Sequence, residues 1–223
     1  MTLARSALHP RLVPRPARSA APLPAPRPEP DLADLRARRL PLGFFQRDVT
    51  TVARALLGTA LIKGERAGII VETEAYLGPD DLASHARFGP TARTSVMFGP
   101  GGVSYVYLCY GVHEMFNIVA DRDGLPSAVL VRALAPLRGL GGDAGAARGP
   151  GKLTRALGLD RGDDRRTLDG DELFVARWQR VPAAQVAVGP RVGVDYAGAC
   201  AGRPLRFWID GHASVSRAPR RSA

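Results

Sequence analysis

Eight prolines lie between Pro10 and Pro30, and they decide which part of this chain can build a compact core. Each proline fixes its own φ and lacks a backbone donor, so neither a helix nor a sheet propagates through such a stretch. Mixed with alanine and arginine, the segment is typical of an extended arm, and its proline disfavours the amphipathic helix of a targeting peptide. We therefore expect a disordered Pro/Arg-rich arm over residues 1–39, one folded domain over 40–216 and a basic tail over 217–223.

The basic charge of the chain is concentrated at its two ends. The 223 residues carry 31 Lys and Arg against 21 Asp and Glu, a net charge of +10, which favours a polyanionic partner. Residues 1–39 hold eight arginines against three acids, and residues 217–223 hold three arginines, which leaves +2 for 40–216. Charge alone therefore supports affinity for nucleic acid without establishing it.

The two cysteines, Cys109 and Cys200, are too few for a disulfide framework or for a four-thiolate metal site. A reducing, cytoplasmic environment is the expected location of such a chain. No apolar run reaches the roughly 18 residues of a membrane span, so we expect no membrane partner.

Short runs of strand-forming residues dominate the chain beyond residue 40. Two of them, 103–110 and 112–119, meet at Tyr110-Gly111, which is a hairpin signal. We expect a single α+β domain on a largely antiparallel curved sheet, with short flanking helices and a protruding β-hairpin. The other elements are expected as helices over 51–57 and 153–157, and as strands over 60–62, 67–76, 128–134, 173–176, 191–194 and 205–209.

The strand expected over 67–76 ends in an alternation of acidic and uncharged residues. Period-two geometry directs Glu72, Glu74 and Tyr76 to one face of the strand. The plain interpretation is a solvated acidic face. However, the preceding Ile69-Ile70-Val71 indicates burial on both faces, and a buried carboxylate is costly unless it is paired or functional.

Arg132 is the single charged residue of the apolar strand expected over 128–134. A guanidinium in such a strand needs a carboxylate or another acceptor, and Glu74 is a candidate partner. The residues alone leave open whether such a pair is structural or catalytic.

Three of the five tyrosines, Tyr105, Tyr107 and Tyr110, fall within six residues. They could be ordinary core or cross-strand aromatic pairs, or they could present flat faces on which bases stack. Tyr110 at the hairpin tip is expected to be exposed, and an exposed tip aromatic can act as a wedge in DNA.

His85 lies at the start of a long loop rich in glycine and proline, over 82–102. Loops of that length inside a compact domain are usually functional or disordered, although a lone loop histidine is more often incidental. Glu72, Glu74 and His85 make only a weak metal triad. The glycine-rich stretch that ends in Gly151-Lys152-Leu153 lacks the Ser or Thr of a Walker A loop, so ATP chemistry is rejected.

Several ordered motifs together resemble the alkyladenine DNA glycosylase family, the 3-methyladenine DNA glycosylases of mammalian type. The resemblance runs from about residue 42 to 217. It is carried by Val71-Glu72-Thr73-Glu74-Ala75-Tyr76-Leu77-Gly78-Pro79-Asp80-Asp81, Ala83-Ser84-His85, Met97-Phe98-Gly99-Pro100-Gly101, Tyr105-Val106-Tyr107-Leu108-Cys109-Tyr110-Gly111 and Asn117.

This resemblance implies hydrolysis of the N-glycosylic bond of a damaged purine in double-stranded DNA, without lyase activity, metal or organic cofactor, by a chain expected to be a monomer. It implies that Glu74 is the general base and that Arg132 helps hold the attacking water. The base pocket is implied to be walled by Tyr76, His85 and Tyr107, floored by Asn117 and accompanied by the wedge Tyr110.

The chemistry fits these residue types. A purine alkylated at N3 or N7 is cationic, so aromatic faces attract it by roughly 0.5–2 kcal/mol, and the charge makes it a good leaving group. General-base help from a carboxylate contributes typically 10²–10⁴-fold. Two other interpretations stay open, a non-catalytic binder of damaged DNA and a metal-dependent nuclease built on Glu72, Glu74 and His85. Which damaged purine is preferred is not set by the sequence.

Overall fold

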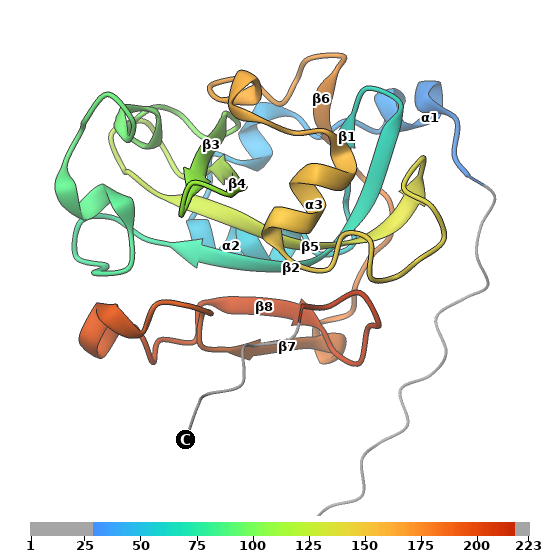
Figure 1. The fold of residues 1–223 in the computed structure, drawn as a ribbon. Coiled ribbons are helices and arrows are strands. Elements are labelled where there is room, and N and C mark those ends of the chain that lie inside the picture. The colour runs from blue at the N-terminus through green and yellow to red at the C-terminus, as the bar shows by residue number, and fades with distance from the viewer. Residues whose placement is uncertain (1–28, 217–223) are drawn as a thin grey trace, which may run out of the picture.

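The computed structural model describes residues 29–216, so most of the expected arm and the whole tail over 217–223 lie outside the described residues. The described part is a single α+β unit on an open sheet (Figure 1). Its α-helices are α1 (Leu32–Ala37), α2 (Val49–Ala55) and α3 (Pro150–Leu157), and short 3₁₀ helices include the one at His85–Phe88. Its strands are β1 (Ala60–Lys63), β2 (Arg66–Tyr76), β3 (Ser104–Cys109), β4 (His113–Val119), β5 (Ala128–Arg138), β6 (Leu173–Ala176), β7 (Val186–Gly189) and β8 (Arg206–Ile209).

The sheet is antiparallel throughout its named pairs and centres on β2. Strand order is β3-β4-β5-β2-β1-β6, while β8 pairs with β2 and β7 pairs with β8. Strand β5 follows one side of β2 along its length, whereas β1 and then β8 share the other side. The second half of β2 is therefore enclosed between β5 and β8, and this is the half that carries the two glutamates.

Two helices close the main core beside these strands. In α2, the side chain of Asp48 caps the first turn, and Val49, Val52 and Ala53 are buried. Helix α3 begins with Pro150 at its first position and is capped after Leu157 by Gly158, whose φ of +73° suits glycine. Both helices contribute to the same hydrophobic cluster as β2 and β5, so the central strand is fixed from several directions.

Most of the expected elements are confirmed. Strands β1 and β2 pair across the Lys63–Arg66 turn, β6 has the expected bounds, and β3 and β4 pair as a hairpin. In the hairpin turn Tyr110 and Gly111 have φ of +49° and +70°, and the Val112 N–H donates to the Cys109 carbonyl at 3.1 Å. This left-handed pair is typical of the turns that join tight hairpins.

Two expectations were wrong. Residues 191–194 do not form a strand; the strand of this region is β7, at Val186–Gly189, and 191–194 lie in the loop after it. The ordered chain also begins before residue 40, because Leu32 and Leu35 of α1 are buried against β1 and β6. Within the described residues, no helix is both long and apolar enough to cross a membrane.

Candidate active site

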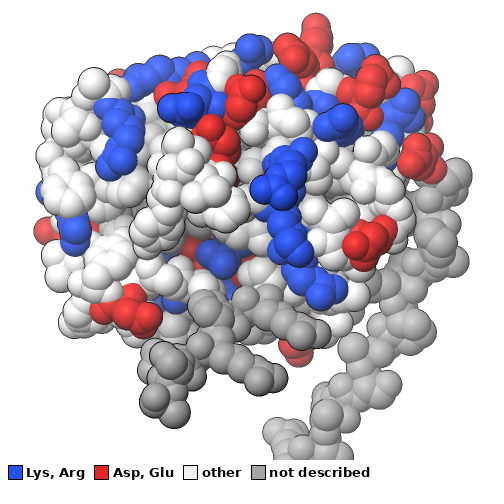
Figure 2. Space-filling model, viewed as in Figure 1, with Lys and Arg blue, Asp and Glu red and all other residues white. Residues whose placement is uncertain are grey.

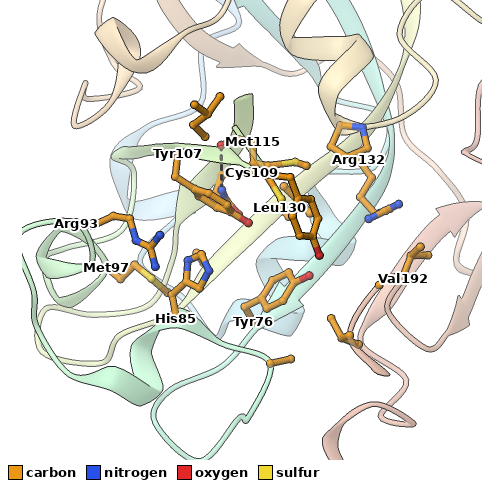
Figure 3. A pocket seen from close by; sticks show the side chains of 18 of the residues that line it. Tyr76, His85, Arg93, Met97, Tyr107, Cys109, Met115, Leu130, Arg132 and Val192 are labelled. Atoms are coloured by element: carbon orange, nitrogen blue, oxygen red, sulfur yellow. Dashed lines mark hydrogen bonds between the residues drawn. The ribbon is translucent and has the colours of Figure 1, made fainter. Parts of the chain in front are cut away.

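A pocket of about 450 Å³ opens beside β2, β3, β4 and β5 and the loop that follows β7. Arg132 and Val192 lie at one end, and Arg93 and Met97 lie at the other (Figure 3). The face of the molecule seen in the space-filling view is hollowed, and Lys or Arg atoms and Asp or Glu atoms are visible inside the hollow (Figure 2). Residues more than 100 positions apart in the sequence thus meet in one cavity.

One wall of the pocket is aromatic. The rings of His85 and Tyr107 pack edge-to-face with centroids 4.7 Å apart, and the rings of Tyr105 and Tyr107 lie 5.3 Å apart. His85 Nδ1 and the Tyr105 hydroxyl are hydrogen-bonded at 2.9 Å, which fixes the orientation of the imidazole. Tyr76 completes the ring-lined surface from the end of β2 (Figure 3).

The ring groups of this wall are held in their neutral forms. Burial, together with the positive charges of Arg93 and Arg87, lowers the pKa of His85 to about 4. Burial raises the pKa of Tyr105 to about 12 and raises that of Tyr107 as well. This aromatic part of the pocket, called the aromatic slot below, therefore presents uncharged ring faces throughout the neutral pH range. Such faces suit a flat and cationic ligand.

Glu74 is fully buried immediately behind this surface. One carboxylate oxygen accepts from the Val192 N–H at 2.8 Å, and the other accepts from the Tyr76 hydroxyl at 2.9 Å and from Arg132 Nη1 at 3.3 Å. All three donors belong to residues that line the pocket, although Glu74 itself is not part of the lining. The expected pairing of Glu74 with Arg132 is confirmed.

Glu72 is buried in the same way but has different partners. It accepts hydrogen bonds from Arg132 Nε at 3.1 Å, from Arg206 Nε at 2.7 Å, and from both the N–H and the hydroxyl of Ser216 at 2.7 and 2.9 Å. Arg132 therefore bridges the two carboxylates. Burial alone would lower the pKa of Arg132, but the charges of Glu74 and Glu72 outweigh it and raise that pKa.

Irregular pairing between β2 and β5 aims these side chains. The register passes from Ile70 opposite Leu134 to Glu72 opposite Ala133, and then to Thr73 opposite Val131. Arg132 is thus the extra residue of a bulge on β5. Bulges commonly redirect a side chain next to a functional site, and here the bulge lets one guanidinium reach both glutamates.

The loop after β7 is locked by a buried ion pair that the sequence analysis missed. Arg191 forms a two-pronged salt bridge with Asp81, at 2.5 and 2.7 Å, and both side chains have no exposed surface. The same guanidinium donates to the Ala75 carbonyl and lies 4.7 Å from the Tyr76 ring centroid. The pair therefore fixes both the next residue, Val192, and the ring of Tyr76.

Asn117 and Tyr110 both line the pocket. Asn117 lines the pocket and is buried, with its amide donating to the carbonyls of Tyr105 at 3.1 Å and Met115 at 3.3 Å. Tyr110 also lines the pocket, and its side chain is 91% exposed. Tyr196, 63% exposed, belongs to the same rim and was not singled out from the sequence, where nothing distinguished it.

No group of three or more His, Cys, Asp or Glu side chains in the described part of the chain comes together in a way that could hold a metal ion. The trio Glu72, Glu74 and His85 is therefore not assembled as a metal site. His85 hydrogen-bonds to Tyr105, and the two glutamates bind Arg132 between them.

Comparison with known proteins decides the family. Residues 43–213 match the model of the family described as methylpurine-DNA glycosylase (MPG). This chain belongs to that family. The membership confirms the resemblance inferred from the motifs and makes the chain a DNA glycosylase.

The sequences of several curated relatives match this chain over most of their own length. A protein of Anaeromyxobacter sp. (strain Fw109-5) is 52% identical over 181 residues, which are 79% of this chain and 91% of the relative. One from Myxococcus xanthus (strain DK1622) is 50% identical over 184 residues, 81% and 94% of the two chains. One from Legionella pneumophila (strain Corby) is 40% identical over 184 residues, 81% and 99%. All three are named as candidate 3-methyladenine DNA glycosylases.

Proposed function

We propose that this methylpurine-DNA glycosylase takes an alkylated purine flipped out of double-stranded DNA and hydrolyses its N-glycosylic bond with a water activated by Glu74. The base leaves with the bonding electrons, the water oxygen joins C1′, and one water proton passes to Glu74. The product is an abasic site. We propose further that the enzyme acts as a monomer in the cytoplasm.

The difference between the two buried glutamates carries this proposal. A carboxylate offers about four lone-pair sites to donors. Among the described residues, four donors reach Glu72 and three reach Glu74. All three donors to Glu74 belong to residues that line the pocket, and its Oε1 accepts only from the Val192 N–H, which leaves an acceptor position on that oxygen for a water. Three of the four donors to Glu72 come instead from Arg206 and Ser216, which do not line the pocket.

The neutral aromatic slot supports a cationic alkylated purine as the substrate. Stacking between Tyr76, Tyr107 and His85 would attract such a base by roughly 0.5–2 kcal/mol over an uncharged one. A positively charged base also leaves readily, so a general base and charge stabilisation at the sugar suffice. The names of the relatives point to 3-methyladenine as one such base.

Asn117 and Tyr110 complete the proposal for recognition. The Asn117 amide, held by two backbone carbonyls at the pocket wall, would discriminate against bases that carry an extra exocyclic group. Tyr110 would enter the duplex from a hairpin that protrudes toward it and fill the space left by the flipped nucleotide. Flipping costs a few kcal/mol, and such a wedge offsets part of it.

The test is release of the free base from alkylated duplex DNA in the presence of EDTA, followed by mass spectrometry under single-turnover conditions. Glu74→Gln is expected to slow release by roughly 10²–10⁴-fold while binding of the damaged duplex is kept. Glu65→Gln, in the exposed β1–β2 turn, is the matched control and should excise at the wild-type rate.

Three outcomes would overturn the proposal. Full excision by Glu74→Gln would show that another group activates the water. Binding without release by the wild-type protein would favour a non-catalytic damage binder, and strand cleavage that needs Mg²⁺ would favour a nuclease.

A further inference from the structure

We propose that Glu72 is a positioning residue for this reaction, and that it acts by holding Arg132 away from a two-pronged pair with Glu74. The inference rests on the proposed role of Glu74. It also assigns a task to Ser216, because that residue supplies two of the four donors that hold Glu72.

Arg132 is divided between two acceptors. Its Nε donates to Glu72 and its Nη1 donates to Glu74, so each carboxylate receives one bond from Arg132. Arginine and a carboxylate otherwise favour two parallel hydrogen bonds. If Glu72 did not hold Nε, the guanidinium could turn both prongs onto Glu74. The remaining acceptor position of Glu74 would then be occupied, and the water would lose its base.

Glu72 is itself anchored by groups far away in the sequence. Arg206 is paired with Glu74 in the β2–β8 register, yet its Nε donates to Glu72 at 2.7 Å. Its Nη2 also donates to the Ser216 carbonyl at 3.1 Å. The Ser216 N–H, 144 positions from Glu72, donates to the carboxylate at 2.7 Å. These contacts set the position of Glu72 from β8 and from the segment after it.

Charge balance favours the same assignment. Two fully buried carboxylates lie together, and two guanidiniums, those of Arg132 and Arg206, neutralise them. A purely structural ion pair would need only one carboxylate and one guanidinium. The second carboxylate has a distinct consequence, because it makes Arg132 a one-bond partner of the proposed base.

The first experiment compares Glu72→Gln with Asp163→Asn in the full chain. Asp163 is also a buried carboxylate with a salt bridge, to Lys63 at 2.6 Å, and it does not line the pocket. Single-turnover excision of an alkylated base is measured at a temperature where both variants are folded by circular dichroism. Glu72→Gln is expected to lose roughly ten- to hundredfold in rate, the size expected for a bond to a charged group. Asp163→Asn should excise normally, and affinity for duplex containing an uncleavable abasic analogue should stay within about twofold in both.

A double-mutant cycle separates positioning from mere stability. If Glu72 acts through Arg132, then adding Arg132→Lys to Glu72→Gln lowers the rate by no more than about twofold further. Losses that multiply, or a Glu72→Gln variant that is less stable but excises at the wild-type rate, would overturn the inference.

Ser216→Ala keeps the test valid if Glu72→Gln does not fold. It removes one donor to Glu72 and no charge, and is expected to slow excision roughly two- to tenfold with unchanged affinity for the abasic duplex. Excision by folded Ser216→Ala at the full wild-type rate would count against the proposal. Absence of excision by the wild-type protein would instead refute the proposed function, which keeps the two failures distinct.

Discussion

The two ends of the pocket differ in charge and in the backbone that carries them. At the carboxylate end, Glu72 and Glu74 lie on β2, enclosed between β5 and β8, and donors from several elements hold them. At the aromatic end, His85 lies on a short 3₁₀ helix and Tyr107 on β3, the first strand in the sheet order. The first end is built from carboxylates paired with guanidiniums, whereas the second is built from neutral rings with Arg93 beside them.

This difference shows what each kind of group requires from the fold. A buried charge is tolerated only when paired and hydrogen-bonded, which demands a rigid scaffold with donors at set positions. Uncharged rings need only packing, so loops and edge strands can supply them. We therefore expect substitutions at the charged end to change stability or chemistry, and substitutions at the aromatic end to change the choice of substrate.

The largest effect on stability is expected from Asp81→Asn, which breaks the ion pair beneath the charged end. Burial would raise the pKa of Asp81, but the hydrogen bonds and charge of Arg191, together with the N–H groups of Leu77 and Ala83, outweigh burial and lower that pKa. Leaving the Arg191 charge buried without its partner should cost roughly 3–5 kcal/mol in the free energy of unfolding, measured by urea denaturation. Asp171→Asn, whose side chain is 82% exposed, is the control and should stay within about 0.5 kcal/mol.

Tyr76→Phe removes the hydroxyl at the junction of the two ends and keeps the ring. Loss of a hydrogen bond to the Glu74 carboxylate should lower the free energy of unfolding by about 1.5–3 kcal/mol in the same assay. Tyr196→Phe, whose hydroxyl makes only a 3.4 Å contact, should lose less. Equal losses of unfolding free energy in the two variants would mean that the buried hydrogen bond to Glu74 stabilises the protein no more than the long contact of Tyr196.

Tyr107→Leu tests the aromatic end by itself. The variant should reduce kcat/KM for a cationic alkylated purine by roughly 2–30-fold, the equivalent of a lost cation–π contact, and should affect a neutral deaminated purine less. Both substrates are compared in the same duplex context. An equal loss on both would show that the ring acts through shape rather than through charge.

The smallest effect concerns His85 and the pH dependence of stability. The folded protein keeps this imidazole neutral down to a pKa of about 4, whereas the unfolded chain takes up the proton near 6.5. Stability should therefore fall as the pH drops from about 6.5 toward 4. His85→Gln should flatten this part of the profile, measured as the difference in melting temperature between variant and wild type at each pH. Parallel profiles would contradict the assignment.

Local rules of sequence were enough for much of the fold, and together with the family resemblance they supplied the list of candidate residues. Strand alternation placed Glu72, Glu74 and Tyr76 on one face, and the contacts of Arg132 and Tyr76 with Glu74 agree with it. The same rules failed at residues 191–194, where an apolar pattern suggested a strand. There the buried Arg191–Asp81 pair, formed between segments 110 positions apart, imposes a loop instead.

The sequence by itself determined which chemical groups this protein has and on which strand they lie, because the two-residue period and the turn preferences act within a few residues. Only the tertiary structure decided which of two similar glutamates is held by residues that line the pocket. That property depends on donors from Arg132, Val192, Arg206 and Ser216, all distant in sequence. No local pattern records such contacts, since they arise only when the strands and the chain end pack together.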